Sequence, residues 1–295
     1  MKLGIEKLNE LKQIAIAAAK EAGSFIENYN RKNISVVNKS DNNITGESLA
    51  SQVVTEVDQK CQEIILKHLN PTLNEYSLGL LTEESEDDLS RFRNDYFWCV
   101  DPLDGTLAYI NNVSGYAVSI ALVSKGGNSQ LGIVYDPVEK ILYHAIKGGG
   151  VYKNQITMQP LPTADSKTLV FYTDKSFTEY VNYAPTILKL KEIARKFLQA
   201  DLEIIENGGA VLNACRVLEN PFACYFKPPK HAKGGGSLWD FAATACLFEE
   251  FGAFVSTMFG EPIPLNQKNP FMNEQGVLYT NHPVIYKNIK KLMNY

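Results

Sequence analysis

The chain has 295 residues, of which 45% are hydrophobic and 21% are charged, a balance that is ordinary for a globular protein. Its formal net charge of −4 excludes the basic footprint of a protein that binds a nucleic-acid polymer. No apolar run reaches the roughly 18 residues that span a bilayer, and five cysteines without a CxxC pair argue against a disulfide framework. We therefore expect a cytoplasmic protein with no membrane partner.

The N-terminal segment predicts a packing helix, because apolar residues between Leu8 and Tyr29 recur every three or four positions. The polar stretch that follows predicts a short strand at Ile34 to Val37 and then a loop. The stretch VVTEVDQKCQEIILKHLNP (53–71) predicts a second helix. We expect Asn70-Pro71 to end it, since a residue before proline disfavours helical backbone.

The middle of the chain predicts strands. The runs YAVSIALVS, LGIVYDP, ILYHAI and GGVYKN are β-branched or aromatic and are separated by turn residues, which indicates an antiparallel sheet with hairpins. From about Leu161 predicted strands and helices alternate, which favours α/β organisation. We predict two halves that share a tight interface: an α+β half at 1–160 and an α/β half with a mixed sheet at 161–295.

Four acidic stations lie where a predicted apolar element begins or ends: Thr55 with Asp58, Glu83 with Glu84, Asp101 with Asp104, and Asp240. Core packing can hold carboxylates stiffly at such places, and a solvated charge needs no such anchoring. Several rigid carboxylates suit a hard cation such as Mg²⁺, and a carboxylate that bridges two such ions suits an in-line phosphoryl displacement. The stations therefore predict a metal site for a phosphorylated substrate.

The turn DPLDGT is the most informative station. Pro102 restricts the backbone, so that Asp101, the Leu103 carbonyl and Asp104 can point into the same space. The glycine and threonine that follow offer N–H groups where a helix begins, as a seat for phosphate oxygens. Each station alone also fits a capped turn, a helix cap or a solvated acidic loop. Their occurrence together, in this order, favours the metal site.

The motifs VTEVDQK, TEES, DPLDGT, GIVYDPVEKILYHAIKGGGVYKN and WDFAATACLFEEFGA, in this order, resemble the inositol monophosphatase family. This family belongs to the lithium-sensitive phosphatases, which include fructose-1,6-bisphosphatases and 3'(2'),5'-bisphosphate nucleotidases. The resemblance covers nearly the whole chain. It implies a layered αβαβα sandwich and the Mg²⁺-dependent hydrolysis of a small phosphate monoester without a covalent intermediate. It also allows a homodimer, since family members are often dimers.

The resemblance further implies a set of metal ligands. Glu83, Asp101 and the Leu103 carbonyl would hold a first Mg²⁺ ion. Asp101, Asp104 and Asp240 would hold a second ion on the side of the leaving group. A third, weaker ion near Glu83 is allowed. Asp101 would therefore bridge two ions.

Catalytic and substrate-binding roles follow from the same resemblance. Thr106 would hydrogen-bond the attacking water while Asp58 orients its hydroxyl, so Asp58, Thr106 and Glu83 are the predicted catalytic residues. The Gly105 and Thr106 amides would bind phosphate. Gly209 is predicted as a further substrate contact, in the segment NGGAVLNA (207–214), where the family often carries a hydroxyl residue that this chain lacks.

The approach to Asp240 departs from the family. The segment FKPPKHAKGGGSLWD (226–240) is basic, whereas inositol-specific members typically place an acidic residue there. We predict that Lys230 and Lys233 contact a second anionic group of the substrate, which favours a bisphosphate. A flexible surface loop with solvated lysines is the alternative.

Several activities stay open at this stage. A bisphosphate nucleotidase or a sugar bisphosphatase of the same superfamily fits the motifs, and an inactive relative that binds a small ligand is a more distant alternative. The aspartyl-phosphate phosphatases are disfavoured, because their DxDGT motif spaces the two aspartates by two positions and this chain spaces them by three.

Overall fold

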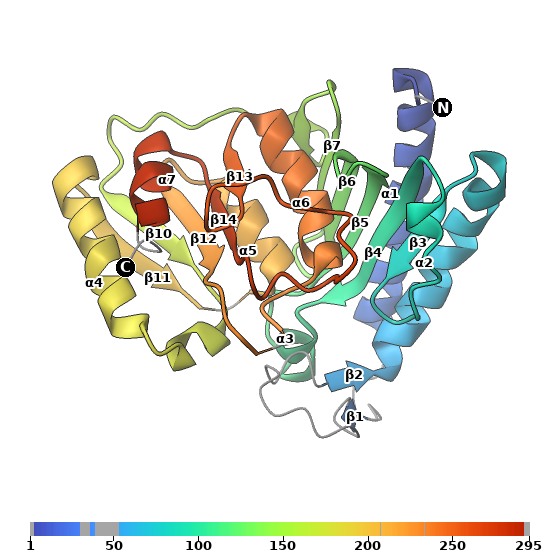
Figure 1. Ribbon diagram of the computed structural model, residues 1–295, viewed down its shortest axis with the longest axis horizontal. Coiled ribbons are helices and arrows are strands. Elements are labelled where there is room, and N and C mark those ends of the chain that lie inside the picture. The colour runs from blue at the N-terminus through green and yellow to red at the C-terminus, as the bar shows by residue number, and fades with distance from the viewer. Residues whose placement is uncertain (1–2, 30–35, 39–52, 207, 233, 292–295) are drawn as a thin grey trace.

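The computed structural model describes residues 3–29, 36–38, 53–206, 208–232 and 234–291. The helices and sheets alternate in layers, in the order helices, sheet, helices, sheet, helices (Figure 1). The αβαβα sandwich that the family resemblance implied is therefore confirmed. Within these ranges no helix is both long and apolar enough to cross a membrane.

The first layer consists of α1 (Ile5–Asn28) and α2 (Glu56–Glu75), which cover the outer face of the first sheet (Figure 1). The predicted period of α1 is confirmed, because its buried residues recur at helical spacing: Leu8, Leu11, Ala15, Ala18, Ala19, Ala22, Gly23 and Ile26. Many of these side chains are small, so the helix lies close to its neighbours. Gly23 has no room for a Cβ atom, which would lie 2.4 Å from the Tyr135 ring on the sheet.

The region before α2 differs from the prediction. Val53–Thr55 forms strand β2, which pairs antiparallel with β1 (Val36–Asn38), and the helix begins only at Glu56. A β-branched run pairs readily with a neighbouring strand, so this tertiary contact overrides the helical pattern. Val36 and Val37 of the strand predicted at Ile34 to Val37 lie in β1, and residues 30–35 and 39–52 fall outside the described ranges.

The predicted end of α2 is wrong. Pro71 lies inside the helix, which continues for a further turn to Glu75. The buried Thr72 hydroxyl donates to the Leu69 carbonyl over 2.6 Å and accepts from Trp98 Nε1 on the sheet over 2.9 Å. These contacts hold the last turn in place although proline cannot donate a backbone hydrogen bond.

The first sheet has seven strands in the order β3-β4-β5-β6-β7-β8-β9. The pairs from β5 to β8 are antiparallel, as predicted. The flanking pairs β4 with β5 and β8 with β9 are antiparallel as well, whereas β3 and β4 are parallel. The strands are β3 (Gly79–Thr82), β4 (Tyr96–Asp104), β5 (Ala117–Ser124), β6 (Ser129–Asp136), β7 (Ile141–Ile146), β8 (Val151–Lys153) and β9 (Ile156–Thr157). Because β3 and β4 are parallel, their carboxyl ends meet at one edge of the sheet.

The second sheet has five strands in the order β11-β10-β12-β14-β13. The three strands β11, β10 and β12 are parallel, and β14 pairs antiparallel with both β12 and β13. The strands are β10 (Thr168–Tyr172), β11 (Asp201–Ile205), β12 (Ala223–Lys227), β13 (Phe254–Ser256) and β14 (Val277–Thr280). The predicted mixed sheet is confirmed.

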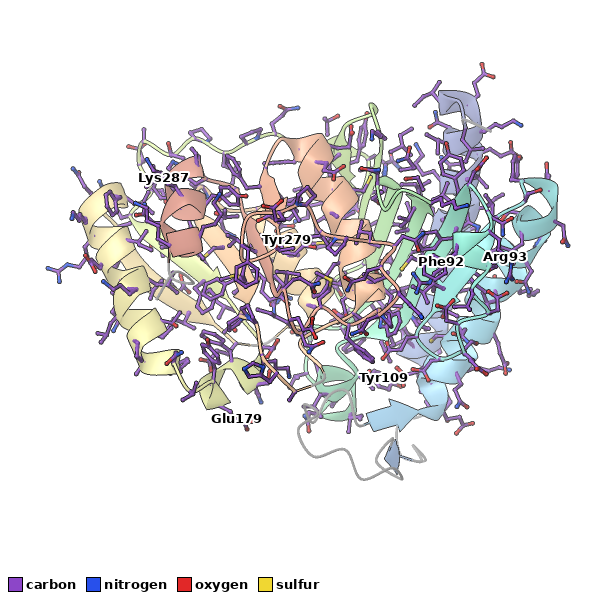
Figure 2. The ribbon with its side chains drawn as sticks, viewed as in Figure 1. Phe92, Arg93, Tyr109, Glu179, Tyr279 and Lys287 are labelled. Atoms are coloured by element: carbon purple, nitrogen blue, oxygen red, sulfur yellow. The ribbon has the colours of Figure 1, made fainter. Side chains whose placement is uncertain are left out.

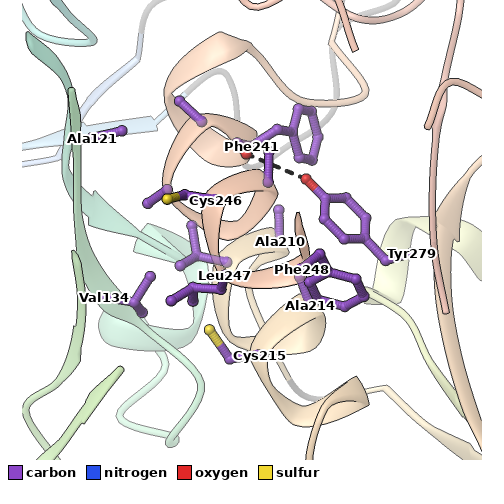
Figure 3. Packing of buried hydrophobic residues seen from close by; sticks show 14 of the residues in the cluster. Ala121, Val134, Ala210, Ala214, Cys215, Phe241, Cys246, Leu247, Phe248 and Tyr279 are labelled. Carbon is purple, nitrogen blue, oxygen red and sulfur yellow. Dashed lines mark hydrogen bonds between the residues drawn. The ribbon is translucent and has the colours of Figure 1, made fainter. Parts of the chain in front are cut away.

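The middle layer consists of α5 (Ala210–Val217) and α6 (Leu238–Phe251), which lie between the two sheets. Figure 3 shows Cys215 on α5, Phe248 on α6 and Tyr279 on β14 in one apolar core, where the Tyr279 hydroxyl donates to the Phe241 carbonyl. The outer layer, α4 (Tyr183–Ile193) and α7 (Pro283–Lys290), covers the far face of the second sheet. Because α5 and α6 pack on both sheets, the two sheets share one core; the domain boundary at residue 160 stays a prediction.

Candidate active site

Asp101 and Asp104 lie at the end of β4, where the strand contains a bulge. Asp101 is opposite Ser119 of β5 and Asp104 is opposite Ala117, so three steps along β4 match two steps along its partner. In a regular strand, residues three positions apart point to opposite faces. The extra residue restores the alternation and lets both carboxylates reach one site. Asp101 and Asp104 are 1% and 6% exposed.

The Asp104 carboxylate is fixed by the first turn of α5. Its Oδ1 atom accepts from the Ala210 N–H over 3.1 Å, and its Oδ2 atom accepts from the Val211 N–H over 2.8 Å. Free N–H groups at a helix N-terminus favour a negative charge. Gly209 lies directly against this carboxylate, since a Cβ atom there would be 2.3 Å from Asp104 Oδ2. The glycine therefore permits the close approach of α5 to β4.

Asp240 comes from the first turn of α6. The Ser237 N–H donates to its Oδ2 atom, and together with the Ser237 side chain this contact forms a capping box. The Ser119 hydroxyl, opposite Asp101 on β5, donates to the Trp239 carbonyl over 3.2 Å and fastens this helix end to the first sheet. Carboxylate oxygens of Asp101, Asp104 and Asp240 lie within 4.8 Å of one another. Asp240 thus both caps a helix and joins the acidic cluster.

Glu83 enters from the neighbouring parallel strand. It follows Thr82, which is paired with Val100, and its N–H donates to the Val100 carbonyl over 3.2 Å. Its charge is close enough to raise the pKa of Asp101. Glu83 and the adjacent Glu84 are half-buried. The carboxyl ends of β3 and β4 therefore bring a fourth carboxylate near Asp101, beside the cluster.

The cluster is electrostatically unfavourable without a cation. Burial, and then the charges of Glu83, Asp104 and Asp240, raise the pKa of Asp101 well above its ordinary value. Burial and then the charge of Asp240 raise the pKa of Asp104 to about 8. Burial also raises the pKa of Asp240, although the charge of Lys227 opposes this shift. Like charges this close stay ionised together only beside a compensating cation.

Thr106 lies between Asp58 of α2 and the end of β4. It opens the short helix α3 (Thr106–Ile110), as the sequence predicted, and Gly105 before it has a left-handed φ of 84°. The Thr106 hydroxyl lies 3.3 Å from Asp58 Oδ1 and 3.1 Å from the Leu103 carbonyl oxygen. In Figure 2 the labelled residue Tyr109 marks α3, which lies below the two sheets in this view. One hydroxyl hydrogen can satisfy only one of the two acceptors at a time.

The donor set fits a hard divalent cation. All side-chain donors in the cluster are carboxylate oxygens, and the nearby Leu103 carbonyl is a neutral oxygen donor with a second lone pair. Mg²⁺ prefers oxygen ligands of this kind. The raised pKa values of Asp101 and Asp104 give the physical reason, because a bound cation would keep both groups ionised.

The basic segment begins at the end of β12. Lys227 forms a 3.0 Å ion pair with Asp174, which follows β10. Lys230 is half-buried and its backbone N–H donates to the Asn273 carbonyl over 2.7 Å. Lys233 lies outside the described residues.

The comparison with known sequences identifies the family. The profile of the inositol monophosphatase family matches residues 7–294. The chain belongs to this family. It is 24% identical over 286 residues to an inositol-1-monophosphatase of Bacillus subtilis, with 95% of each chain covered. It is 28% identical over 254 residues to Nus factor SuhB of Escherichia coli K12, covering 86% of this chain and 87% of that one.

Solved structures share the fold of this inositol monophosphatase family member. A Staphylococcal inositol monophosphatase-1, solved as a 100 mM LiCl soaked inhibitory complex, matches with a TM-score of 0.72 and 20% identity, and 100% of this chain and 97% of that chain are covered. The inositol monophosphate bound SaIMPase-II matches with a TM-score of 0.67 and 21% identity, at 95% and 92% coverage. Family membership makes the chain a phosphoric monoester hydrolase.

The sites predicted for this family member differ in how closely the structure groups them. Asp101, Asp104 and Asp240 form one cluster, the charge of Glu83 acts on Asp101, and Thr106 lies beside Asp58. Gly209 contacts Asp104, and Lys230 lies in the segment after β12. The sequence analysis did not identify Asp174, which pairs with Lys227, or Ser119, which bonds to the Trp239 carbonyl, as residues of the site. A carboxylate that directly follows a predicted strand, in TLVFYTD (168–174), was the available signal for Asp174.

Proposed function

We propose that the protein is a Mg²⁺-dependent phosphatase that hydrolyses a small phosphate monoester by direct attack of water. The observation that carries this proposal is the convergence of Asp101, Asp104 and Asp240, whose carboxylate oxygens lie within 4.8 Å of one another. Because the three carboxylates are buried and repel one another, the site is unfavourable without a cation and favourable for binding one.

Two ions account best for the donors. We assign Glu83, Asp101 and the Leu103 carbonyl to one ion, and Asp101, Asp104 and Asp240 to the other. When bound, Mg²⁺ lowers the pKa of a coordinated water and offsets negative charge on the phosphate and the leaving oxygen. The chain contributes rigidity, because a β-bulge, a helix N-terminus and a capping box fix the carboxylates.

Thr106 and Asp58 orient the attacking water in this proposal. The Thr106 hydroxyl donates its hydrogen to Asp58 or to the Leu103 carbonyl, so its lone pairs remain available to accept a hydrogen bond from water. Asp58 is 4% exposed, and this burial keeps it in place. The Gly105 and Thr106 amides are the proposed seat of the phosphate oxygens.

Related structures support a small phosphorylated substrate and sensitivity to Li⁺. One of them contains inositol monophosphate, and another is an inhibitory complex with LiCl. All five cysteines are free and buried, which fits a reducing compartment such as the cytoplasm. We propose that location for the enzyme; a homodimer stays a prediction from the family.

The test is phosphate release from a panel of phosphate monoesters, with Mg²⁺ or with EDTA. Asp101→Asn should reduce turnover by more than about a hundredfold, because it removes a charge shared by two ions. Calorimetry should show weaker Mg²⁺ binding by the folded variant. Asp165→Asn, an exposed aspartate remote from the cluster in sequence, is the matched control. Turnover by Asp101→Asn at a tenth of the wild-type rate or more would refute the shared ligand.

A further inference from the structure

We propose that Lys227 and Lys230 bind a second anionic group on the substrate, and that Asp174 positions Lys227 for this contact. The substrate would then be a bisphosphate, in which one phosphate is hydrolysed and the other is recognised. This inference rests on the proposed phosphatase function and adds the class of substrate.

Lys227 and Asp174 occupy matching positions at the carboxyl ends of two neighbouring strands of the second sheet. Strands β10 and β12 are parallel and Tyr172 is opposite Tyr225, so the residues two positions further on, Asp174 and Lys227, lie side by side. Their Nζ and Oδ2 atoms are 3.0 Å apart, and the side chains are only 21% and 23% exposed. Asp174 also accepts a hydrogen bond from Ser176. The lysine is therefore held at a defined place.

This place lies beside the acidic cluster. The charge of Lys227 is close enough to oppose the rise in the pKa values of Asp104 and Asp240 that burial causes. Ligands of open α/β sheets bind beyond the carboxyl ends of parallel strands, which is where β10 and β12 place the ion pair. A substrate phosphate at the cluster would thus leave the rest of the molecule near Lys227.

Lys230 adds a positive charge that forms no direct ion pair within the described residues, although the charge of Asp174 acts on it. In the part of the chain that the structure describes, no carboxylate forms an ion pair with Lys230. Two hydrogen bonds with Asn273 hold its backbone, from Lys230 N to the Asn273 carbonyl and from Asn273 Nδ2 to the Lys230 carbonyl. Burial and then the charge of Lys227 lower the pKa of Lys230, and the charge of Asp174 offsets only part of this shift. A half-buried, unpaired cation is costly, and an anion bound beside it removes that cost.

The chemistry of lysine selects for an anion over a neutral polyol. An ammonium group has three donors and no acceptor, so it cannot accept hydrogen bonds from sugar hydroxyls. It matches phosphate oxygens, which accept only. The pair of Lys227 and Asp174 is neutral as a unit, and Lys230 adds one positive charge on this side of the acidic cluster. Carboxylate and phosphate share this chemistry, and a second phosphate offers the greater charge.

The experiment compares matched substrates that differ by one phosphate. The pairs are adenosine 3'-phosphate with adenosine 3',5'-bisphosphate, and inositol 1-phosphate with inositol 1,4-bisphosphate, each assayed with Mg²⁺. We expect wild-type kcat/KM to be higher for the bisphosphate in at least one pair. Lys227→Met and Lys230→Met should each lower the ratio of bisphosphate to monophosphate kcat/KM about tenfold, mainly through the KM of the bisphosphate. Lys189→Met, on exposed α4, should leave the ratio unchanged.

The outcomes separate this inference from the proposed function. Phosphate release from the monophosphates at equal or higher kcat/KM, or ratios that the lysine variants do not change, would overturn the inference and leave the phosphatase standing. If Lys227→Met changed the Mg²⁺ requirement equally for both substrates, Lys227 would act only as a counter-ion of the acidic cluster. This outcome would also overturn the inference. No release from any of the four compounds would overturn both. Asp174→Asn should also lower the ratio of bisphosphate to monophosphate kcat/KM, since Lys227 loses its positioning partner. Lys230→Met removes no ion pair. It therefore tests the inference even where the other variants unfold.

Discussion

Gly209 lies directly against the Asp104 carboxylate in the candidate active site, which makes Gly209→Ala an informative substitution. The added Cβ atom would lie 2.3 Å from Oδ2 and 2.7 Å from Cγ of Asp104, whereas ordinary contact begins near 3.4 Å. The backbone of Gly209 has φ −65° and ψ 171°, which alanine adopts without strain. The overlap with the carboxylate is therefore the main effect of the substitution.

The carboxylate cannot move aside without loss. It accepts hydrogen bonds from Ala210 N over 3.1 Å and Val211 N over 2.8 Å, and relief of the overlap needs a shift of about 1 Å that strains or breaks them. A lost hydrogen bond to a charged group costs about 1.5–3 kcal/mol. A misplacement of about 1 Å near reacting atoms can lower kcat on the order of a hundredfold. We expect both weaker Mg²⁺ binding and a lower kcat.

The assay is phosphate release as a function of Mg²⁺ concentration, together with the thermal unfolding temperature. Gly208→Ala is the matched control, because its Cβ atom would overlap Asn213 Oδ1 at the same 2.3 Å and not touch Asp104. Both variants should lose stability, and only Gly209→Ala should need more Mg²⁺. A Gly209→Ala enzyme with wild-type kcat and Mg²⁺ dependence would refute the assignment of Asp104 as a fixed ligand. An equal rise in the Mg²⁺ requirement of both variants would attribute the effect to α5 as a whole.

Three further substitutions or conditions test other parts of the account. Thr106→Ala should lower kcat on the order of a hundredfold with little change in KM. Thr106→Ser keeps the hydroxyl and should stay active. A raised KM at unchanged kcat would contradict the role of Thr106 in orienting water. The folded-state pKa of Asp104 is about 8, against an ordinary 3.8, so its contribution to stability is present below pH 3.8 and is lost as the pH rises through about 8. The metal-free unfolding temperature should therefore fall over that range, and Mg²⁺ should raise it more at high pH than at low pH; a shift independent of pH would count against the site. Arg91 is fully buried and contacts Asp87 over 2.9 Å and Asn266 over 2.8 Å. Arg91→Met should therefore lower the free energy of unfolding, measured in urea, by about 3–5 kcal/mol. Arg93 is exposed (Figure 2), and Arg93→Met should change this free energy by less than about 0.5 kcal/mol.

Local sequence patterns were enough to locate most elements. The period of three and four in α1 and the short β-branched runs of β5 to β7 predicted their structures, because each buries one face in a regular repeat. The patterns failed where a distant contact decided the outcome. Pro71 lies within α2 because Trp98, 27 positions after it in the chain, bonds to Thr72 and holds the last helical turn.

The candidate site likewise depends partly on local sequence and partly on tertiary packing. The sequence by itself determined which groups are available: carboxylates at the ends of apolar elements, a threonine after DPLDG and lysines before Asp240. Only the tertiary structure decided how they meet, through the bulge in β4, the α5 amides on Asp104 and the register that pairs Asp174 with Lys227. The physical reason is that burial and periodicity act over a few neighbouring residues. The spacing between charges depends instead on the packing of segments that lie far apart along the chain.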